Sequence, residues 1–470
     1  MSSSPLPPAR PPQALALGKA IARGEVDPVA LARERLAAAH DAPKVFLTLC
    51  RERALLEAEA ARARAAAGLP RGLLDGVPLA WKDLVDLRGT VTTAGSPALQ
   101  RLRRPAREDA PVAARASGAG LVSIGKTNLT ELAYSGLGFN PHFGTPLGPA
   151  PQAPPRMPGG SSSGSAVAVA LGIVPLAVGT DTAGSLRIPA AFNGIVAFRP
   201  SRARHDLTGV TPLARSLDTL GPMATSVADC IALDDCLRTG VPRRREPTPP
   251  DTLRLVVDAA VLSDPRVAPA VKINLQRAMD RLAAGQVHVT YRPLATVDAT
   301  LHLIATLGWL GAPEAYAEYA WLLDTKEAEL MDPRVRRRLQ AAASSRADHV
   351  FRLQRERDRL IPALGDELEG ALLVMPTVAH TAPEIAPLER DFDLFTKTNF
   401  DTLRLTMVGS YLDLPTVALP TGTDGAGQFT GLQVSAPSGD DERLLRAALT
   451  LSQVLGIEAP ERSDDNASPG

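Results

Sequence analysis

The sequence predicts an α/β protein, and two observations support that prediction. From Leu73 onward, short apolar runs such as VPLAW and GLVSIG alternate with helical stretches, as strands and helices do when they share one sheet. Hydrophobic residues make up 45% of the chain, and 51 basic side chains balance 51 acidic ones, which is typical of a globular protein. The length of 470 residues fits two or three domains and equally one large α/β domain.

The first 68 residues are expected to be mainly helical. Residues 1–12 are rich in serine and proline, and we expect them to be mobile. Helices are predicted over ALALGKAIARGE and, behind the start signal of Asp27 and Pro28, over VALARERLAAAH. A third helix, rich in alanine, arginine and glutamate, is predicted over residues 51–67.

A proline-rich linker divides the rest of the chain. VPRRREPTPP, at residues 241–250, has four prolines in ten residues, which disfavours both helix and strand. A predicted strand, LRLVV, follows it, and long helical stretches continue to about residue 365. The arginines of RVRRRLQAAASSR in this part are expected on a solvated helix face rather than against a polyanion. Three apolar segments (ALLVMPT, LPTVALPTG and GLQVSAP) then predict strands, and a helix over ERLLRAALTLSQVLG precedes a polar tail.

Composition and spacing argue against several classes of function. The net charge of zero gives no global field that would attract nucleic acid or an anionic membrane. The seven histidines never fall in H-x-x-H or H-E-x-x-H spacing, so no helical metal site is indicated. Cys50, Cys230 and Cys236 are too few for a disulfide scaffold, and prolines interrupt the N-terminus where a signal peptide needs an apolar run. We therefore expect a cytoplasmic protein without a metal, a nucleic-acid partner or a membrane span.

Two familiar motifs occur in contexts that do not support them. GLVSIGKT, at residues 120–127, fits the phosphate-loop pattern, but its middle residues are themselves a predicted strand, so Lys126 is expected at the surface or at a strand end. The run GSSSG from Gly160 fits the G-x-S-x-G pattern, which would make Ser162 a nucleophile. That pattern requires a strand directly before it, and the preceding APQAPPRMPGG is too rich in proline to form one.

Residues 158–190 are the most informative part of the sequence. A Gly/Ser run leads into a helix of small residues, then a strand, PLAVGT, and then a second small-residue turn that contains Ser185. Such turns let the backbone approach a ligand closely and expose N–H groups to an anion. The same pattern also suits a tightly packed helix–strand unit, so either turn alone leaves both interpretations open.

Together the two turns resemble the signature of the amidase signature family. The family pattern is a Gly-Gly-Ser-Ser run followed at a fixed distance by G-x-D-x-G-G-S-[IV]-R-x-P, and the chain has GGSSSG from Gly159 and GTDTAGSLRIP from Gly179. Further segments are also similar to the family: GVPLAWKDLVD, TTAGS, GKTNLTELAYSGLGFNPHFGTP and SLDTLGPMATSVADC. The resemblance covers most of the chain and weakens between about residues 250 and 370.

The resemblance implies one large domain over residues 1–470, with a central mixed β-sheet flanked by helices. In this organisation residues 69–240 form the catalytic core, and residues 251–365 form a variable, mostly helical segment on the substrate side. Residues 366–460 return to the core sheet, and residues 461–470 are a mobile tail.

The resemblance also implies a Ser-cisSer-Lys triad, with Ser185 as nucleophile, Ser161 after a cis peptide bond, and Lys82 as base. The chemistry is reasonable on its own terms, because a serine hydroxyl needs an adjacent base to attack at neutral pH. A lysine can act as that base when burial lowers its pKa, and Trp81 and Leu84 flank Lys82 with apolar surface.

The family further implies three sets of residues around the nucleophile. One set holds the oxyanion through backbone N–H groups, one orients the turn and borders the substrate, and one lines the acyl pocket. These sets are, in that order, Thr182, Ala183, Gly184 and Ser185; Asp181 and Arg187; and Ala133, Tyr134 and Ser135. Ala183 stands where many members have glycine, and we expect its methyl group to narrow the pocket beside the oxyanion.

The expected function is hydrolysis of a linear amide or carbamoyl-type C–N bond through an acyl-enzyme on Ser185. No cofactor is implied, the partner is a small-molecule amide, and a homodimer is left open. The alternative is the glutaminase (A) subunit of a tRNA-dependent amidotransferase, whose members usually carry S-I-R-Q-P where this chain has Ile188 in the glutamine position. The choice among amide, urea-like and carbamate substrates stays open.

Overall fold

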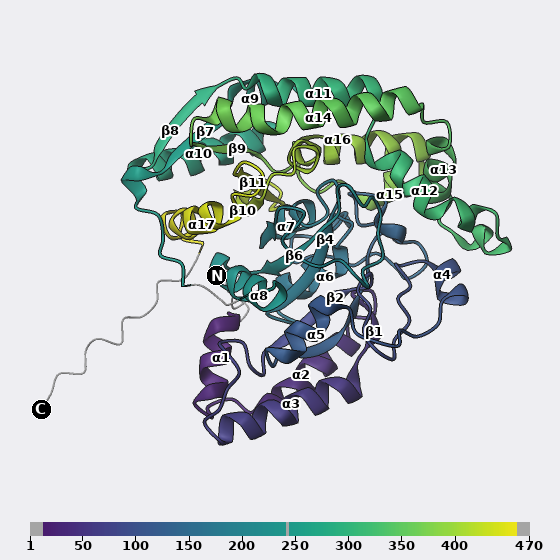
Figure 1. Ribbon diagram of the computed structural model, residues 1–470, viewed down its shortest axis with the longest axis vertical. Helices are drawn as coiled ribbons and strands as arrows, with labels where there is room; N and C mark the ends of the chain where they lie inside the picture. The colour runs from purple at the N-terminus through teal and green to yellow at the C-terminus, as the bar shows by residue number, and fades with distance from the viewer. Residues whose placement is uncertain (1–12, 241–243, 458–470) are drawn as a thin grey trace, which may run out of the picture.

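The computed structural model shows one eleven-stranded sheet at the centre of the molecule, flanked by helices (Figure 1). It describes residues 13–240 and 244–457. The segment 1–12, the first residues of the linker and the tail 461–470 lie outside these ranges, so the expectations for them stay predictions. The predicted α/β class and single domain are confirmed.

The strands alternate with helices along the chain, as the sequence pattern requires. In chain order they are β1 Phe46–Leu49, β2 Pro78–Lys82, β3 Val122–Thr127, β4 Leu176–Asp181, β5 Val196–Arg199, β6 Thr219–Ala224, β7 Arg254–Asp258, β8 His288–Arg292, β9 Leu372–Pro376, β10 Thr416–Thr423 and β11 Phe429–Ser435. Their order across the sheet is β1-β3-β2-β4-β6-β5-β10-β11-β9-β7-β8. β2 is parallel to β3 and β4, and β7 is parallel to β8 and β9. The other pairs are antiparallel, so the sheet is mixed, as predicted.

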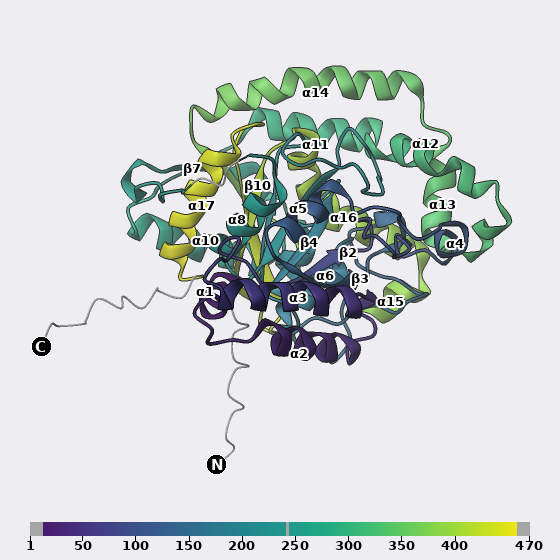
Figure 2. The same ribbon diagram turned by 60° about the horizontal axis from the view of Figure 1, so that its bottom comes forward.

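Helices make up much of the remaining described chain. They are α1 Ala14–Ala22, α2 Pro28–His40, α3 Arg51–Ala66, α4 Pro97–Leu102, α5 Pro111–Gly118, α6 Ser163–Ala170, α7 Arg187–Asn193, α8 Val227–Leu237, α9 Ala259–Ser263, α10 Pro269–Ala284, α11 Ala295–Leu307, α12 Gly311–Leu323, α13 Pro333–Ala342, α14 Ala347–Leu368, α15 Ile385–Arg390, α16 Phe392–Tyr411 and α17 Asp441–Leu455, with 3₁₀ turns η1 Glu131–Ala133, η2 Pro250–Thr252 and η3 Lys326–Leu330. Figures 1 and 2 show α2 and α3 at one end of the molecule and α11 and α14 at the other, with the sheet between them.

The three predicted N-terminal helices are present and follow their sequence signals. The Asp27 side chain accepts a hydrogen bond from Val29 N at 3.0 Å, and Pro28 occupies the first position of α2. The third helix, α3, ends at Ala66, one residue before its predicted end.

No strand was predicted for β1, β5, β6 or β8, and two of these, β1 and β8, form the edges of the sheet. β1 has four residues, and the residues of β8 are all exposed or half-buried. An edge strand has a neighbour on one side only and needs less apolar surface, which weakens its sequence pattern. The segment 251–365 is mostly helical, and besides the predicted strand LRLVV it contains β8, which the hydrophobic pattern did not predict.

The hydrophobic core follows the sheet from its N-terminal to its C-terminal strands. Trp81 on β2, Val178 on β4 and Phe198 on β5 are fully buried members of the largest cluster. Cys230 on α8 belongs to the same cluster and is a packing residue. Among the helices of the described chain, none combines the length and apolar character needed to cross a bilayer.

Candidate active site

Two parallel strands, β2 and β4, end beside each other and position the candidate site. Trp81 on β2 pairs with Val178 on β4. Lys82 is the last residue of β2, and Asp181 is the last residue of β4. In open α/β sheets, ligands commonly bind beyond the carboxyl ends of the strands. The sheet therefore brings Lys82 to the turn that contains Ser185.

Lys82 is fully buried, and its amino group has two hydroxyl partners. Nζ donates hydrogen bonds to Ser161 Oγ at 2.7 Å and to Thr180 Oγ1 at 2.8 Å. Burial lowers the pKa of Lys82 to about 7, and the negative charges of Asp181 and Asp218 oppose that shift. The neutral form that a general base needs is therefore well populated at neutral pH.

Ser161 follows Gly160 through a cis peptide bond, as the family resemblance implied. The loop here packs so closely that a Cβ on Gly160 would lie 2.5 Å from Gly138 N, so only glycine fits. Ser162, the nucleophile of the G-x-S-x-G interpretation, is also fully buried, and its Oγ donates to the Thr180 carbonyl at 3.2 Å. The Ser162 side chain thus fastens the loop to β4.

The turn after β4 is held in place by a buried ion pair. Asp181 accepts hydrogen bonds from Gly184 N at 2.8 Å, from Leu186 N at 3.1 Å, and from Nε and Nη2 of Arg187 at 3.0 Å each. Burial alone would raise the pKa of Asp181, but the charges of Arg187 and Arg199 lower it to about 2. Asp181 and Arg187 therefore orient the turn from within the core, and neither lines the cavity at Ser185.

These contacts show which of the four backbone N–H groups expected to bind the oxyanion are available to do so. The Gly184 N–H already donates to Asp181, which removes it from the set. Within residues 13–240 and 244–457, the structure records no acceptor for the N–H groups of Thr182, Ala183 and Ser185. Thr406 Oγ1 donates to the Ala183 carbonyl at 2.6 Å and fixes the orientation of that peptide. Oriented N–H groups without a partner are what a developing oxyanion requires.

A small cavity opens at Ser185. Its wall includes all three residues predicted for the acyl pocket, together with two from the oxyanion turn: Ala133, Tyr134, Ser135, Thr182 and Ala183. The remaining wall residues are Leu213, Trp309, Gly311, Arg338, Leu403 and Met407. Trp309, Gly311 and Arg338 come from the segment that was expected on the substrate side.

The loop that carries the acyl-pocket residues has a strained backbone. Leu132 and Ala133 have φ angles of 53° and 58°, in the left-handed region that non-glycine residues rarely adopt. Such conformations cost about 1 to 3 kcal/mol each and persist at functional sites whose surroundings enforce them. Ser135 Oγ donates to Asn399 Oδ1 on α16 at 2.9 Å, which ties the loop to a neighbouring helix.

Arg338 on α13 is a cavity residue that the sequence interpretation missed. Its guanidinium lies over the Tyr134 ring, 4.2 Å from the ring centre, and donates a hydrogen bond to the Tyr134 carbonyl. Burial is the main influence on its pKa and lowers it, and no carboxylate is among the groups that act on it. The cavity therefore contains a cation that the described chain does not pair with an acid.

The expectation that the arginines of α13 form a solvated face is wrong for Arg334 and Arg338. Arg334 is only 9% exposed and stacks on Phe139 at 4.8 Å. The two arginines are four residues apart and share a helix face with the buried Val335 and Leu339. This helical periodicity was the available signal, and counting the arginines as one charged run concealed it.

Lys126, the lysine of GLVSIGKT, is fully buried near the end of β3, so the surface placement is wrong and the strand-end placement is right. Its Nζ lies 2.6 Å from Asp83 Oδ1 and 2.7 Å from Thr92 Oγ1. β3 pairs with β1 on one side and β2 on the other. A motif that forms a central strand cannot wrap around a phosphate.

Comparison with known proteins decides the family. The family model described as Amidase matches residues 28–445. The chain belongs to the amidase signature family. This amidase signature protein is an amidohydrolase that acts on carbon–nitrogen bonds of amides.

Relatives of this amidase signature protein align over most of their length. The A subunit of glutamyl-tRNA(Gln) amidotransferase from Thermus thermophilus is 34% identical over 94% of this chain and 97% of its own. 2-amino-5-chloromuconic acid deaminase of Comamonas testosteroni is 30% identical over 85% of this chain and 87% of its own. A crystal structure of an amidase is 31% identical with a TM-score of 0.82, covering 94% of this chain and 99% of that one.

Proposed function

We propose that the protein hydrolyses a linear amide or carbamoyl-type bond through an acyl-enzyme on Ser185, with Ser161 and Lys82 as the proton relay. The observation that carries this proposal is the 2.7 Å contact between Lys82 Nζ and Ser161 Oγ next to the turn that presents Ser185 to a cavity. The two loops are joined, since Ser162 N donates to the Ser185 carbonyl at 3.3 Å.

The proposed acylation begins when Ser185 Oγ attacks the carbonyl carbon. Its proton passes to Ser161 while Ser161 gives its own proton to neutral Lys82. The carbonyl oxygen becomes negative and accepts hydrogen bonds from the free N–H groups of the turn, for which Thr182 and Ala183 are available beside Ser185 itself. The C–N bond then breaks, and the proton returns through Ser161 to the leaving amine. Water repeats the sequence on the acyl-enzyme and releases the acid.

The cavity wall favours particular acyl groups. Tyr134, Trp309 and Met407 supply apolar surface, and Arg338 supplies a cation without a carboxylate partner. An acyl group that directs a carboxylate or carbonyl oxygen toward Arg338 would satisfy that cation, because charge-assisted hydrogen bonds are stronger than neutral ones.

The glutaminase subunit of a tRNA-dependent amidotransferase is the second candidate. The corresponding amidotransferase subunits of Thermus thermophilus and Cupriavidus necator are 34% and 32% identical to this chain. Ile188, which stands where such subunits usually carry glutamine, is fully buried near the start of α7. The isoleucine in place of the usual glutamine favours the stand-alone enzyme as the first candidate.

The proposal includes no cofactor and a cytoplasmic location, and it leaves a homodimer open. Cys50, Cys230 and Cys236 form no disulfide with one another, as is common in reducing compartments. In the part of the chain that the structure describes, no three His, Cys, Asp or Glu side chains are grouped as metal ligands would be.

The test is a panel of primary amides, anilides, ureas and carbamates, assayed for ammonia or amine release without ATP, added metal or other subunits. We expect turnover that Ser185→Ala abolishes and that Ser162→Ala retains. Glutamine hydrolysis that appears only when the other amidotransferase subunits are added would favour the second candidate. An inactive Ser162→Ala together with a fully active Ser161→Ala would restore the G-x-S-x-G interpretation.

A further inference from the structure

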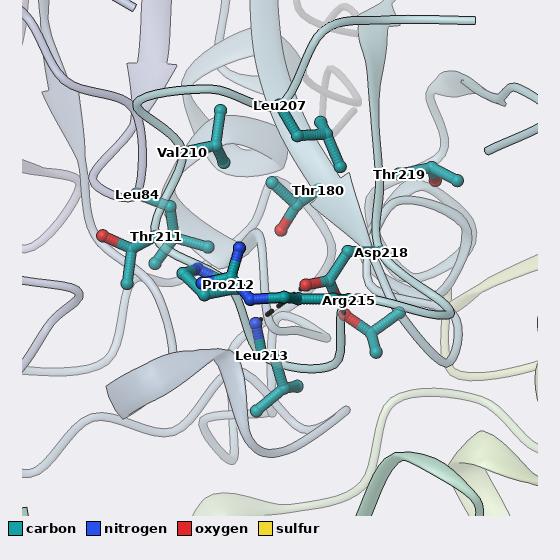
Figure 3. Close-up of a pocket in the computed structure, with 11 residues that line it drawn as sticks. Leu84, Thr180, Leu207, Val210, Thr211, Pro212, Leu213, Arg215, Asp218 and Thr219 are labelled. Atoms are coloured by element: carbon teal, nitrogen blue, oxygen red, sulfur yellow. Dashed lines mark hydrogen bonds between the residues drawn. The ribbon is translucent and has the colours of Figure 1, made fainter. Parts of the chain in front are cut away.

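A second cavity, of about 170 Å³, lies next to the one at Ser185 (Figure 3). It is formed where the ends of β2 and β4 meet the loop between β5 and β6. We call it the amine chamber, and its wall includes Leu84, Thr180, Leu207, Val210, Pro212 and Leu213.

The amine chamber reaches the proposed proton relay. Thr180, whose side chain points into the group of residues drawn in Figure 3, is part of its wall. The Thr180 hydroxyl also accepts a hydrogen bond from Lys82 Nζ at 2.8 Å. One threonine therefore separates this space from the amino group that takes up and returns the proton.

The amine chamber also adjoins the cavity at Ser185, because Thr182 and Leu213 line both spaces. Asp218 fastens these two residues together. Thr182 Oγ1 donates to Asp218 Oδ1 at 2.5 Å, and Leu213 N donates to Asp218 Oδ2 at 2.8 Å. The boundary between the two spaces is thus a defined structure, with the oxyanion turn on it.

The chemistry of the wall is mainly apolar. Leu84, Leu207, Val210 and Pro212 provide the hydrocarbon surface, and the Asp218 carboxylate is occupied by its hydrogen bonds. The Arg215 side chain, which is also part of the wall, is 71% exposed, and its charge is paired with Glu318. A wall of this kind suits an apolar group attached to a hydrogen-bonding atom.

We propose that the amine chamber binds the leaving-amine side of the substrate and accepts an apolar alkyl or aryl substituent on the amide nitrogen. This inference rests on the proposed function. When the C–N bond breaks, the electron pair of that bond goes to nitrogen, and nitrogen takes the proton from the Ser161–Lys82 relay. The leaving nitrogen must therefore lie on the side of the nucleophile nearest Lys82, and the amine chamber is the space that borders Thr180 there. The acyl group occupies the cavity lined by Tyr134.

The test compares paired substrates that share an acyl group. Acetic, butyric, benzoic and glutaric acids are each assayed as the primary amide, for ammonia, and as the 4-nitroanilide, for 4-nitroaniline. Leu207→Trp fills the chamber, so we expect its kcat/KM for the anilides to fall about tenfold or more relative to wild type while that for the primary amides changes little. Intrinsic reactivity cancels, because each substrate is compared with itself.

Two further variants keep the test informative. Leu207→Ala enlarges the chamber and should raise kcat/KM for 2-naphthylamides relative to 4-nitroanilides. Leu69→Trp makes the same chemical change at a leucine that is 71% exposed and lines neither cavity, and it should leave every ratio unchanged.

The outcomes separate this inference from the function on which it rests. An equal fall in kcat/KM for amide and anilide in Leu207→Trp, or no fall for either, would overturn the assignment of the amine chamber and leave the proposed amidase function standing. A wild-type enzyme that hydrolyses primary amides only would do the same. Wild-type protein that releases neither ammonia nor nitroaniline from any pair would overturn the proposed function.

Discussion

Lys82 and Lys126 lie on neighbouring parallel strands of one sheet, and neither side chain is exposed to solvent. Trp81 on β2 pairs with Lys126 on β3, so Lys82 lies one residue beyond the position opposite Lys126. Lys126 Nζ lies 2.6 Å from a carboxylate, that of Asp83. Asp83 follows Lys82 directly in the sequence, yet it pairs with the lysine of the next strand, because consecutive side chains of an extended segment point to opposite sides.

Lys82 has hydroxyl groups where Lys126 has a carboxylate. Ser161 and Thr180 accept its hydrogen bonds without neutralising its charge, and burial then lowers the pKa of Lys82 to about 7. The comparison teaches that two buried lysines on adjacent strands can have different kinds of acceptor. Lys126 pairs with the Asp83 carboxylate, whereas Lys82, the proposed base, contacts the hydroxyls of Ser161 and Thr180.

The largest expected effect is on activity. Lys82→Arg should lower kcat/KM by about 10² to 10⁴-fold, because a guanidinium keeps its proton and cannot act as a general base. Lys126→Arg is the matched control, and it should keep most of its activity, since its role is to supply a positive charge. Steady-state kinetics on the best amide of the panel measure both. Near-normal kcat/KM for Lys82→Arg between pH 6 and 9 would remove Lys82 from the mechanism.

The next effect is on stability, and here the variant of Lys126 is expected to lose more than the variant of Lys82. Lys126→Met leaves the buried Asp83 carboxylate unpaired, so we expect the free energy of unfolding to fall by about 3 to 5 kcal/mol. Lys82→Met leaves no unpaired carboxylate and should cost much less. Urea unfolding followed by circular dichroism compares the two. Recovery of stability in Lys126→Met/Asp83→Asn is the control, and equal losses for the two single variants would break the comparison.

The fold was largely predictable because its apolar periodicity is strong. The strands β2, β3 and β4 are buried along their whole length. Each can therefore be recognised from the apolar residues of its own segment, without knowledge of the strands beside it. The edge strand β8 escaped because a strand with one neighbour needs little apolar surface, and its residues are all exposed or half-buried. Its pairing with β7 is a tertiary contact, which local pattern does not report.

The candidate site was predictable where a motif carries it and not elsewhere. Lys82, Ser161 and Ser185 lie in segments with a fixed local pattern, and the structure places the first two in direct contact. Arg338 was missed because its place depends on how α13 packs against Tyr134, which a charge count cannot reveal. The loss of Gly184 from the oxyanion set follows from a hydrogen bond to Asp181 that only three-dimensional geometry shows.

A third prediction uses the dependence of stability on pH. The ordinary pKa of Lys82 is 10.5, whereas the folded value is about 7, so between these pH values the unfolded chain binds one more proton at this residue than the folded one. Stability contributed by Lys82 therefore rises with pH across this window, by about 1.4 kcal/mol per pH unit. The difference in unfolding free energy, wild type minus Lys82→Met, should rise from pH 7 toward pH 10. A difference that stays constant across the window would mean that folding does not lower the pKa of Lys82.

The smallest expected effect sharpens the role of the second hydroxyl. Thr180→Val keeps the shape of the side chain and removes one of the two acceptors of Lys82, so kcat/KM should fall about tenfold or less, the worth of one hydrogen bond. Thr180→Ser keeps the hydroxyl and is the control. A larger loss in Thr180→Ser than in Thr180→Val would show that the methyl group, and not the hydroxyl, matters at this position.

The most direct test of the central claim is the pH dependence of kcat/KM in wild type and in Asp218→Asn. Burial raises the pKa of Asp218 to about 6, so this carboxyl is the nearby group most easily mistaken for the base. If Lys82 is the base, both proteins lose activity on the acidic side with an apparent pKa of about 7, shifted slightly downward in Asp218→Asn because a negative charge that favoured protonated Lys82 is gone. An acidic limb that disappears in Asp218→Asn, or a wild-type profile that stays flat from pH 5 to 9, would contradict the account.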